Sequence, residues 1–288
     1  MTTTTGERDR GDGRRCPGVV HLVGAGPGDP ELMTLKGARV LAAAEVVVYD
    51  RLVEPRVLDM AAPGAERIFA GKRRDNHFMR QVEINALLVN RAWRGQRVVR
   101  LKGGDPMIFG RAGEELEALA AAGVPFEVVP GVTAAAGCAA SAVIPLTHRD
   151  HARTLVFATG HTLHGLPDLD WDALCRAGQT LVFYMGHKTI HRLCSRLVAH
   201  GLPPELPAAV VENGTLPGQR VLRSTLAAIA AEVDAAALEG PALLVVGEVA
   251  GLTFPLPGEV ATAASGLFEP VGNYVVMAGV IAVLLAAV

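Results

Sequence analysis

Four loops that could hold a ligand each follow a short apolar run. They cover residues 24–30, 102–111, 130–134 and 212–215, and they read GAGPGDP, KGGDPMIFGR, PGVTA and ENGT. Glycine lets the backbone approach a ligand closely, and Asp105 in the second loop offers acceptors for ribose hydroxyls or an amine. One such loop alone indicates only a turn. Four of them, each after a predicted strand, indicate a shared ligand site.

The first loop is close to a dinucleotide-binding turn, but the pattern is broken. A G-x-G-x-x-G turn needs glycine at position 29, where Asp29 stands, and Pro27 and Pro30 remove backbone donors that a pyrophosphate would use. An acid at the end of the next predicted strand, Asp50, is what a nicotinamide enzyme would also need. That reading stays open as an alternative.

The elements that position these loops alternate between short apolar strands and longer helical stretches, a pattern typical of α/β proteins with largely parallel strands. The predicted strands cover residues 19–23, 46–49, 66–69, 98–101, 126–129, 154–158, 181–184, 208–211, 221–223 and 243–246. The predicted helices cover residues 35–44, 81–94, 114–122, 190–200 and 226–233. Ligands of open α/β sheets bind beyond the carboxyl ends of the strands, which is where the four loops fall.

A boundary is suggested by the small-residue run 133–141 and the polar cluster 145–150. We therefore expect two α/β domains with mostly parallel sheets and an active-site cleft between them. The expected segments are a disordered leader over 1–17, an N-terminal domain over 18–135, a C-terminal domain over 136–252 and an apolar tail of unknown role over 253–288.

Composition excludes several classes of protein. Half of the 288 residues are hydrophobic, so the chain can bury a core and is not mainly disordered. The 27 Lys and Arg against 29 Asp and Glu give a net charge of -2, which excludes a globally basic nucleic-acid binder. The four cysteines form neither a C-x-x-C pair nor a disulfide framework. Reduced thiols of a cytoplasmic protein are the simpler account.

Two features are weaker signals. Residues 271–288 carry no charge, but as a helix they would span about 27 Å, short of a hydrocarbon core near 30 Å. Membrane contact through this tail is possible but not favoured. Histidines stand in pairs without a third ligand at a suitable spacing, so we expect no metal.

The loops belong to longer strings that resemble the tetrapyrrole methylase family, and within it the uroporphyrinogen-III C-methyltransferases. In chain order, from about residue 19 to 249, the strings are VGAGPGDPELMTLKG, VVYDRL, GKR, RVVRLKGGDPMIFGR, PGVTAAAGCAASAVIPLTHRD, TLVFYMG, VENGT and PALLVVGEV. The combination of YDRL, GKR and PLTHRD points to the uroporphyrinogen members, since loops like GAGPGD recur more widely in the fold.

The resemblance implies S-adenosyl-L-methionine as methyl donor and a homodimer. The implied reaction methylates uroporphyrinogen III at C2 and C7, giving precorrin-2 by way of precorrin-1, for sirohaem or cobalamin synthesis. Two alternatives remain: another precorrin or cobalt-precorrin methyltransferase of this fold, or a nucleotide-binding module without catalysis.

The resemblance also assigns residues. The implied donor contacts are Pro27, Gly103, Gly104, Asp105, Ile108, Thr133, Ala134, Met185 and Gly214. Asp50 falls on the family's proton-acceptor position and Lys72 on its proton-donor position, although Lys72 could instead orient a substrate carboxylate. Residues 80–85 (RQVEIN) and MIFGRAG depart from the family pattern, which puts substrate fit near residues 73–83 in doubt.

Substrate charge supports the same reading, because uroporphyrinogen carries eight carboxylates. Residues 72–111 contain ten Lys or Arg and three acids, a net charge of +7. Arginine binds carboxylates through two parallel hydrogen bonds, so Arg51, Arg111 and Arg149 are predicted anchors, with His148 beside them in PLTHRD. A solvated helix face is the better account of Arg91, Arg94 and Arg97. No aromatic stacking motif accompanies the basic residues, so we expect no nucleic-acid partner.

Overall fold

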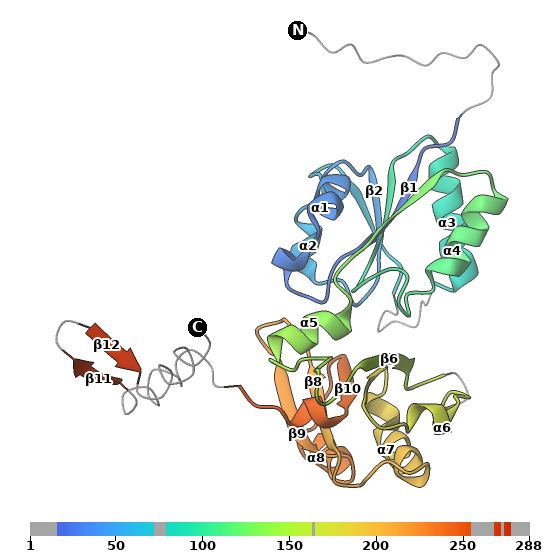
Figure 1. The fold of residues 1–288 in the computed structure, drawn as a ribbon. Helices are drawn as coiled ribbons and strands as arrows, with labels where there is room; N and C mark the ends of the chain where they lie inside the picture. Colours follow the sequence, from blue (N-terminus) through green and yellow to red (C-terminus); the bar gives the residue numbers. More distant parts are fainter. Residues whose placement is uncertain (1–15, 72–78, 163–164, 255–267, 272–273, 278–288) are drawn as a thin grey trace. The chain divides into compact units, whose positions relative to one another are not determined.

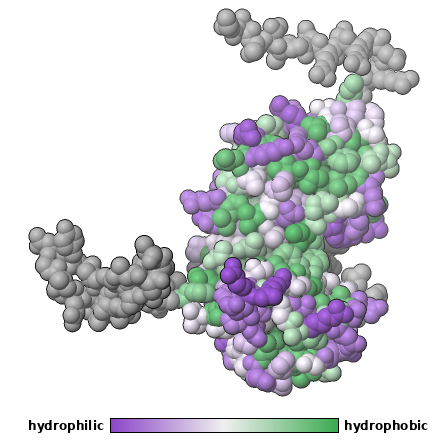
Figure 2. Space-filling view, in the orientation of Figure 1, coloured by the Kyte–Doolittle hydropathy of each residue, from purple (hydrophilic) through white to green (hydrophobic). Residues whose placement is uncertain are grey.

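The computed structural model describes residues 16–71, 79–162, 165–254, 268–271 and 274–277 (Figure 1). Of the described residues, those up to Gly251 belong to one compact unit and those from Leu252 onward to a second. Among the described residues, every helix falls short of the length and apolarity that crossing a bilayer requires. On the face seen in Figure 2, hydrophilic and hydrophobic residues are interspersed.

The first sheet is fully parallel, and its strand order is β3-β2-β4-β1-β5. Its strands are β1 (Val20–Gly24), β2 (Val46–Tyr49), β3 (Glu66–Phe69), β4 (Val98–Lys102) and β5 (Phe126–Val129). Helices cover both of its faces, α1 (Leu35–Ala42) and α2 (Pro55–Leu58) on one, α3 (Gln81–Trp93) and α4 (Ala112–Ala121) on the other (Figure 1). Burial on both faces explains the continuous valine runs of these strands. All five strands end at the same edge, called here the carboxyl edge.

The second sheet has the order β6-β7-β10-β8-β9. Its strands are β6 (Thr154–Thr159), β7 (Gln179–Tyr184), β8 (Pro207–Glu212), β9 (Arg220–Thr225) and β10 (Ala242–Val246). The α/β class is confirmed, but the expectation of mostly parallel strands is wrong for this sheet, in which only β6 and β7 pair in parallel. Residues 213–219 between β8 and β9 are too few for the crossover that parallel neighbours need, so they form a hairpin.

Helices also cover both faces of the second sheet. On one face lie α6 (Trp171–Leu174), α7 (Ile190–Ala199) and α8 (Ile229–Ala235), and on the other lies α5 (Ala134–Ser141). The small-residue run that suggested a boundary is therefore helix α5, whose Ala135 and Cys138 are buried. Alanine is the strongest helix former, and its small side chain allows close packing on the sheet. The domain limits at 135 and 252 stay predictions.

Two strands are described in the second unit. They are β11 (Phe268–Val271) and β12 (Tyr274–Met277), and they pair antiparallel. Residues 274–277 therefore do not form the helix that was considered for 271–288. The predicted leader, apart from residues 16 and 17, lies outside the described residues.

Candidate active site

The loops at 24–30, 102–111 and 130–134, here the first, second and third loops, are joined at the carboxyl edge of the first sheet. The Gly26 N–H donates to the Gly104 carbonyl at 3.2 Å, and the Gly104 N–H donates to the Gly26 carbonyl at 2.7 Å. Asp105 Oδ2 accepts from the Gly131 N–H at 3.0 Å. A Cβ at Gly24 would lie 2.6 Å from both the Gly104 oxygen and the Gly131 nitrogen, so the contact requires glycine.

The loop at 212–215, here the fourth loop, comes from the second sheet and meets the first loop and α5. The Asp29 N–H donates to Thr215 Oγ1 at 3.0 Å. A Cβ at Gly137 of α5 would lie 2.7 Å from Pro27 Cβ, so Pro27 packs directly on this helix. Gly214 packs against Cys138 of α5. The four loops predicted to share a site therefore form one contiguous group.

Tyr184 at the end of β7 connects this group to the second sheet. Its hydroxyl lies 2.6 Å from Thr133 Oγ1 and accepts from the Ala135 N–H at 3.1 Å. The ring packs against Phe109 of the second loop, with 4.8 Å between ring centroids. Burial raises the pKa of Tyr184 above its usual value, so the hydroxyl stays protonated near neutral pH. Sequence analysis missed Tyr184, although it is the last residue of a predicted strand and precedes Met185.

Several non-glycine residues of the site adopt left-handed backbone. Positive φ angles between 50° and 69° occur at Phe109, Arg111, Met185, Asn213 and Thr215. Such conformations cost about 1 to 3 kcal/mol each and gather at functional sites, where the surrounding structure holds them. Five of the seven such non-glycine residues in the described backbone lie in the second and fourth loops or directly after β7, and the other two are Val143 and Ala237, so this strain is concentrated at the loops.

Asp50 directly follows β2 and lies beside the second loop. Its Oδ1 accepts from the Leu52 N–H at 3.1 Å, and its Oδ2 lies 3.3 Å from Arg100 Nη2. The side chain is 27% exposed, so one side of the carboxylate reaches solvent. A Cβ at Gly103 would lie 2.7 Å from Leu52 Cβ, which places the Asp50 turn directly against the second loop.

Three charged residues that sequence analysis left without a role lie beneath this edge. Arg100, Lys102 and Glu115 are only 5%, 4% and 0% exposed. Glu115 Oε1 accepts from Arg100 Nε at 3.0 Å, and both Glu115 oxygens accept from Lys102 Nζ at 3.0 Å. Burial, followed by the charge of Arg100, lowers the pKa of Lys102. The sequence did offer one sign of this group, because Arg100 stands inside a strand that was predicted to be buried. A buried cation is rare unless it is paired with an acid.

The predicted donor contacts lie on or beside the four loops. Thr133 and Ala134 begin α5, and a Cβ at Gly104 would lie 3.4 Å from the Ala134 nitrogen. Ile108 packs against the core of the second sheet. Asp105, which was expected to offer free acceptors, uses Oδ2 for Gly131 and Oδ1 for the Met107 N–H at 2.8 Å. Met185 is exposed beside Tyr184.

The predicted substrate residues fall in two places. Arg51 adjoins Asp50 and is exposed, and Arg111 begins α4. Arg111 binds Glu114 through Nε and Nη2, both at 2.7 Å, and this pairing raises its pKa. An anionic substrate would therefore have to compete with Glu114 for this guanidinium. Lys72 lies outside the described residues.

The structure does not bring His148 and Arg149 to the four loops. They precede β6, whereas Met185 and Gly214 follow β7 and β8, which run in the same direction as β6. His148 lies against His151, with 4.6 Å between ring centroids, and His151 Nδ1 lies 2.6 Å from Glu248 Oε2. These residues therefore occupy the opposite edge of the second sheet.

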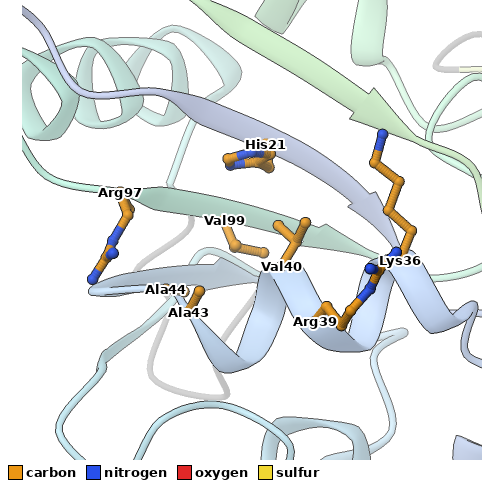
Figure 3. A pocket seen from close by; sticks show the side chains of 8 residues that line it. All are labelled: His21, Lys36, Arg39, Val40, Ala43, Ala44, Arg97 and Val99. Atoms are coloured by element: carbon orange, nitrogen blue, oxygen red, sulfur yellow. The ribbon is translucent and has the colours of Figure 1, made fainter. Parts of the chain in front are cut away.

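A hollow of about 350 Å³ lies elsewhere, near the amino ends of β1 and β4 (Figure 3). Its floor is apolar, and its lining includes His21, Lys36, Arg39 and Arg97. Lys36 pairs with Glu127, and Arg97 Nε lies 3.5 Å from Glu45 Oε2. The four loops do not line this hollow. Within the described ranges, no group of three or more His, Cys, Asp or Glu side chains could hold a metal ion.

Comparison with known sequences agrees with this arrangement. A family model described as tetrapyrrole (corrin/porphyrin) methylases matches residues 19–230. A protein named siroheme synthase from Gluconacetobacter diazotrophicus is 56% identical over 238 residues, covering 82% of this chain and 51% of its own length. One of the same name from Nitrosospira multiformis is 54% identical over 256 residues, covering 89% and 52%. The chain thus spans about half the length of the curated relatives it matches.

Solved structures are similar as well. Uroporphyrin-III C-methyl transferase from Thermus thermophilus, complexed with S-adenyl homocysteine, is 42% identical with a TM-score of 0.69, covering 82% of this chain and 100% of that one. Cobalt precorrin-4 methyltransferase is 27% identical with a TM-score of 0.74, covering 81% and 95%. With most of the folded sequence matched in both kinds of comparison, the chain belongs to the tetrapyrrole (corrin/porphyrin) methylase family.

Proposed function

We propose that this chain transfers methyl groups from S-adenosyl-L-methionine to C2 and C7 of uroporphyrinogen III, giving precorrin-2 by way of precorrin-1 for sirohaem or cobalamin synthesis. The observation that carries the proposal is the joining of the four loops around Gly104, Thr133 and Gly214, with Asp50 beside them. The similar Thermus thermophilus enzyme, with its bound S-adenyl homocysteine, supports the choice of donor and reaction.

The loops fit a donor that combines an adenosine with a charged amino-acid end. Gly103 and Gly104 present bare backbone, and Gly104 has the left-handed φ of 67° that a side chain would disfavour. Ile108 offers apolar contact, and Tyr184 fixes Thr133 and the start of α5. We assign donor contact to the residues predicted from sequence: Pro27, Gly103, Gly104, Asp105, Ile108, Thr133, Ala134, Met185 and Gly214. When bound, S-adenosyl-L-methionine supplies an electrophilic methyl group.

Asp50 acts on the substrate. As a pyrrole carbon forms its bond to the methyl group, the bond between that methyl group and the donor sulfur breaks and S-adenosylhomocysteine leaves, so positive charge spreads over the ring and its N–H becomes acidic. The exposed side of the Asp50 carboxylate stabilises that charge or accepts that proton, a contribution typically worth about 10²- to 10⁴-fold. Lys72 is assigned to return a proton or to hold a substrate carboxylate.

The surroundings of Asp50 suit uroporphyrinogen III, a macrocycle whose ring faces are apolar and whose side chains around the ring carry carboxylates. Four large apolar side chains on the loops of this edge are exposed, namely Leu52, Met107, Phe109 and Met185. Arg51 and Arg111 are assigned to bind the substrate carboxylates. Arg111 would release its ion pair with Glu114 and bind a substrate carboxylate in its place. His148 and Arg149 lie at the opposite edge of the second sheet, so no substrate contact is assigned to them.

We further propose that the enzyme is a cytoplasmic homodimer. The family resemblance supports the dimer, and the free thiols of Cys16, Cys138, Cys175 and Cys194 suit a reducing compartment.

The proposal is tested by anaerobic incubation of the full chain with uroporphyrinogen III and S-adenosyl-L-methionine, followed by mass spectrometry. One and then two added methyl groups are expected, and none when the donor is omitted. A parallel reaction with cobalt-precorrin-4 separates the closest alternative. Methylation of that compound alone would replace the proposed substrate, and donor binding without methylation of either would favour a binding module.

A further inference from the structure

The buried group of Arg100, Lys102 and Glu115 extends from α4 to the catalytic carboxylate. Arg100 uses its whole guanidinium. Nε donates to Glu115, Nη1 donates to the carbonyls of Leu101 at 3.0 Å and Val48 at 3.4 Å, and Nη2 lies 3.3 Å from Asp50 Oδ2. Gln81 Nε2 of α3 donates to Glu115 Oε1 at 3.2 Å. The position of Arg100 is therefore fixed by contacts to β2, β4 and α4.

The charges balance only when Asp50 is counted. Arg100 and Lys102 bring two positive charges beneath the edge, and Glu115 supplies one negative charge. Buried charges are costly unless paired, so the remaining positive charge requires a second carboxylate. Asp50 is that carboxylate. Among the described charged groups, Arg100 and Lys102 of β4 act on Asp50, and Arg51 adjoins it in the chain.

Lys102 connects the same group to the donor loops. Its carbonyl accepts from the Ala25 N–H of the first loop at 2.8 Å. A Cβ at Gly110 would lie 3.2 Å from Lys102 Cε, so the second loop closes over the lysine side chain. One buried cluster thus supports both the loops and the catalytic turn.

We propose that Arg100, held by Glu115, is a positioning residue that keeps the Asp50 carboxylate aimed at the substrate. Arg100 fixes Oδ2 and the Leu52 N–H fixes Oδ1, so the carboxylate cannot rotate away from the edge. This inference rests on the proposed function, because Asp50 matters only if the substrate is methylated beside it. A merely structural cluster would stabilise the fold but would not act through Asp50.

A double-mutant cycle in the full chain tests the inference. The variants are Arg100→Met, Asp50→Asn and both together, with kcat measured for methylation of uroporphyrinogen III. Arg100→Met leaves Glu115 paired with Lys102, and it removes the contact to Asp50 together with the bonds from Arg100 to Glu115 and to the Val48 and Leu101 carbonyls. We expect a loss in kcat of about 10- to 100-fold, with the Kd of S-adenosyl-L-methionine, measured by calorimetry, within about twofold of wild type. In the Asp50→Asn background, the further loss should be below about threefold.

Two more variants make the test specific. Arg100→Lys keeps a positive charge but loses the planar fork, so it should recover part of kcat. The matched control is Arg91→Met. Arg91 donates to Glu66 at the start of β3 through both Nη atoms, away from the four loops, so this variant should leave kcat unchanged.

Equal losses from Arg100→Met in both backgrounds would overturn the inference, as would a kcat near wild type. If Arg100→Met does not fold, Arg100→Lys takes its place in the cycle, with the same criterion for coupling. A wild-type chain that methylates no tetrapyrrole would instead remove the proposed function. The wild-type reaction thus separates the two failures.

Discussion

The two edges of the first sheet differ in where they keep their charges. At the carboxyl edge, Arg100, Lys102 and Glu115 are almost fully buried and pair with one another and with Asp50. The hollow beside α1, which reaches the amino edge at Arg97, is lined by Lys36, Arg39 and Arg97, and the Lys36 and Arg97 ion pairs are half exposed (Figure 3). Exposed pairs contribute little to stability, whereas breaking a buried pair is expensive. A hollow is therefore a poorer guide to the site here than buried charge and strained backbone.

The largest expected effect breaks the pairing at the carboxyl edge. Glu115→Leu leaves Arg100 and Lys102 buried with only Asp50 as partner, so the free energy of unfolding should fall by about 3 to 5 kcal/mol. The amino-edge counterpart, Lys36→Met, removes an exposed partner of Glu127 and should leave the unfolding midpoint nearly unchanged. Urea denaturation of both variants measures the contrast. Similar losses in the two variants would refute the distinction between the edges.

A smaller effect is expected where the carboxyl edge meets the second sheet. Tyr184→Phe keeps the ring but removes the hydroxyl that binds Thr133 and the Ala135 N–H, leaving buried polar groups unsatisfied at a cost of about 1 to 3 kcal/mol. Because Thr133 and Ala134 are proposed donor contacts, calorimetry should show about a tenfold weaker Kd for S-adenosyl-L-methionine. Thr133→Ser retains a hydroxyl and serves as the control. Unchanged donor affinity in Tyr184→Phe would place the tyrosine outside the donor site.

The sequence allowed most strands and the convergence of the loops to be predicted. Runs such as Val46–Tyr49 are apolar throughout because both sheet faces are covered, so their limits are sharp. In a parallel sheet all strand ends meet at one edge, which is why loops far apart in the chain could be assigned to one site. The direction of β10 could not be predicted, because an apolar strand between two others has the same composition in either direction.

The buried contacts of the site were harder to predict. Arg100 and Glu115 are partners only because β4 and α4 pack together, and neither residue type nor spacing shows which cation a carboxylate will meet. Helix α5 was taken as a boundary because its residues are small, although small residues let it pack between Pro27 and the second sheet. His148 and Arg149 were grouped with the site because they belong to the PLTHRD string and because arginine suits carboxylates, and strand direction places them at the other edge.

The smallest expected effect concerns pH at the amino edge. Burial lowers the pKa of His21 below its ordinary value of 6.5, the nearby charge of Glu127 raises it and that of Lys36 lowers it, and burial dominates. Above about pH 6.5, His21 is neutral in both folded and unfolded chains. As pH falls below 6.5, the unfolded chain binds the proton first, so stability contributed by neutral His21 is lost. The free energy of unfolding contributed by His21 changes by less than about 1.4 kcal/mol per pH unit. Solvent screening reduces this change further, because the ring is only partly buried.

The measurement compares urea unfolding of wild type and His21→Leu at pH 8 and pH 5.5. The wild type should lose more stability than the variant over this interval, since only the wild type can protonate at position 21. Greater wild-type stability at pH 5.5 would mean that the His21–Glu127 pair, 3.4 Å apart, outweighs burial. The His21–Glu127 pair would then contribute to stability at the amino edge. The difference in stability between the charge pairs of the two edges would be smaller.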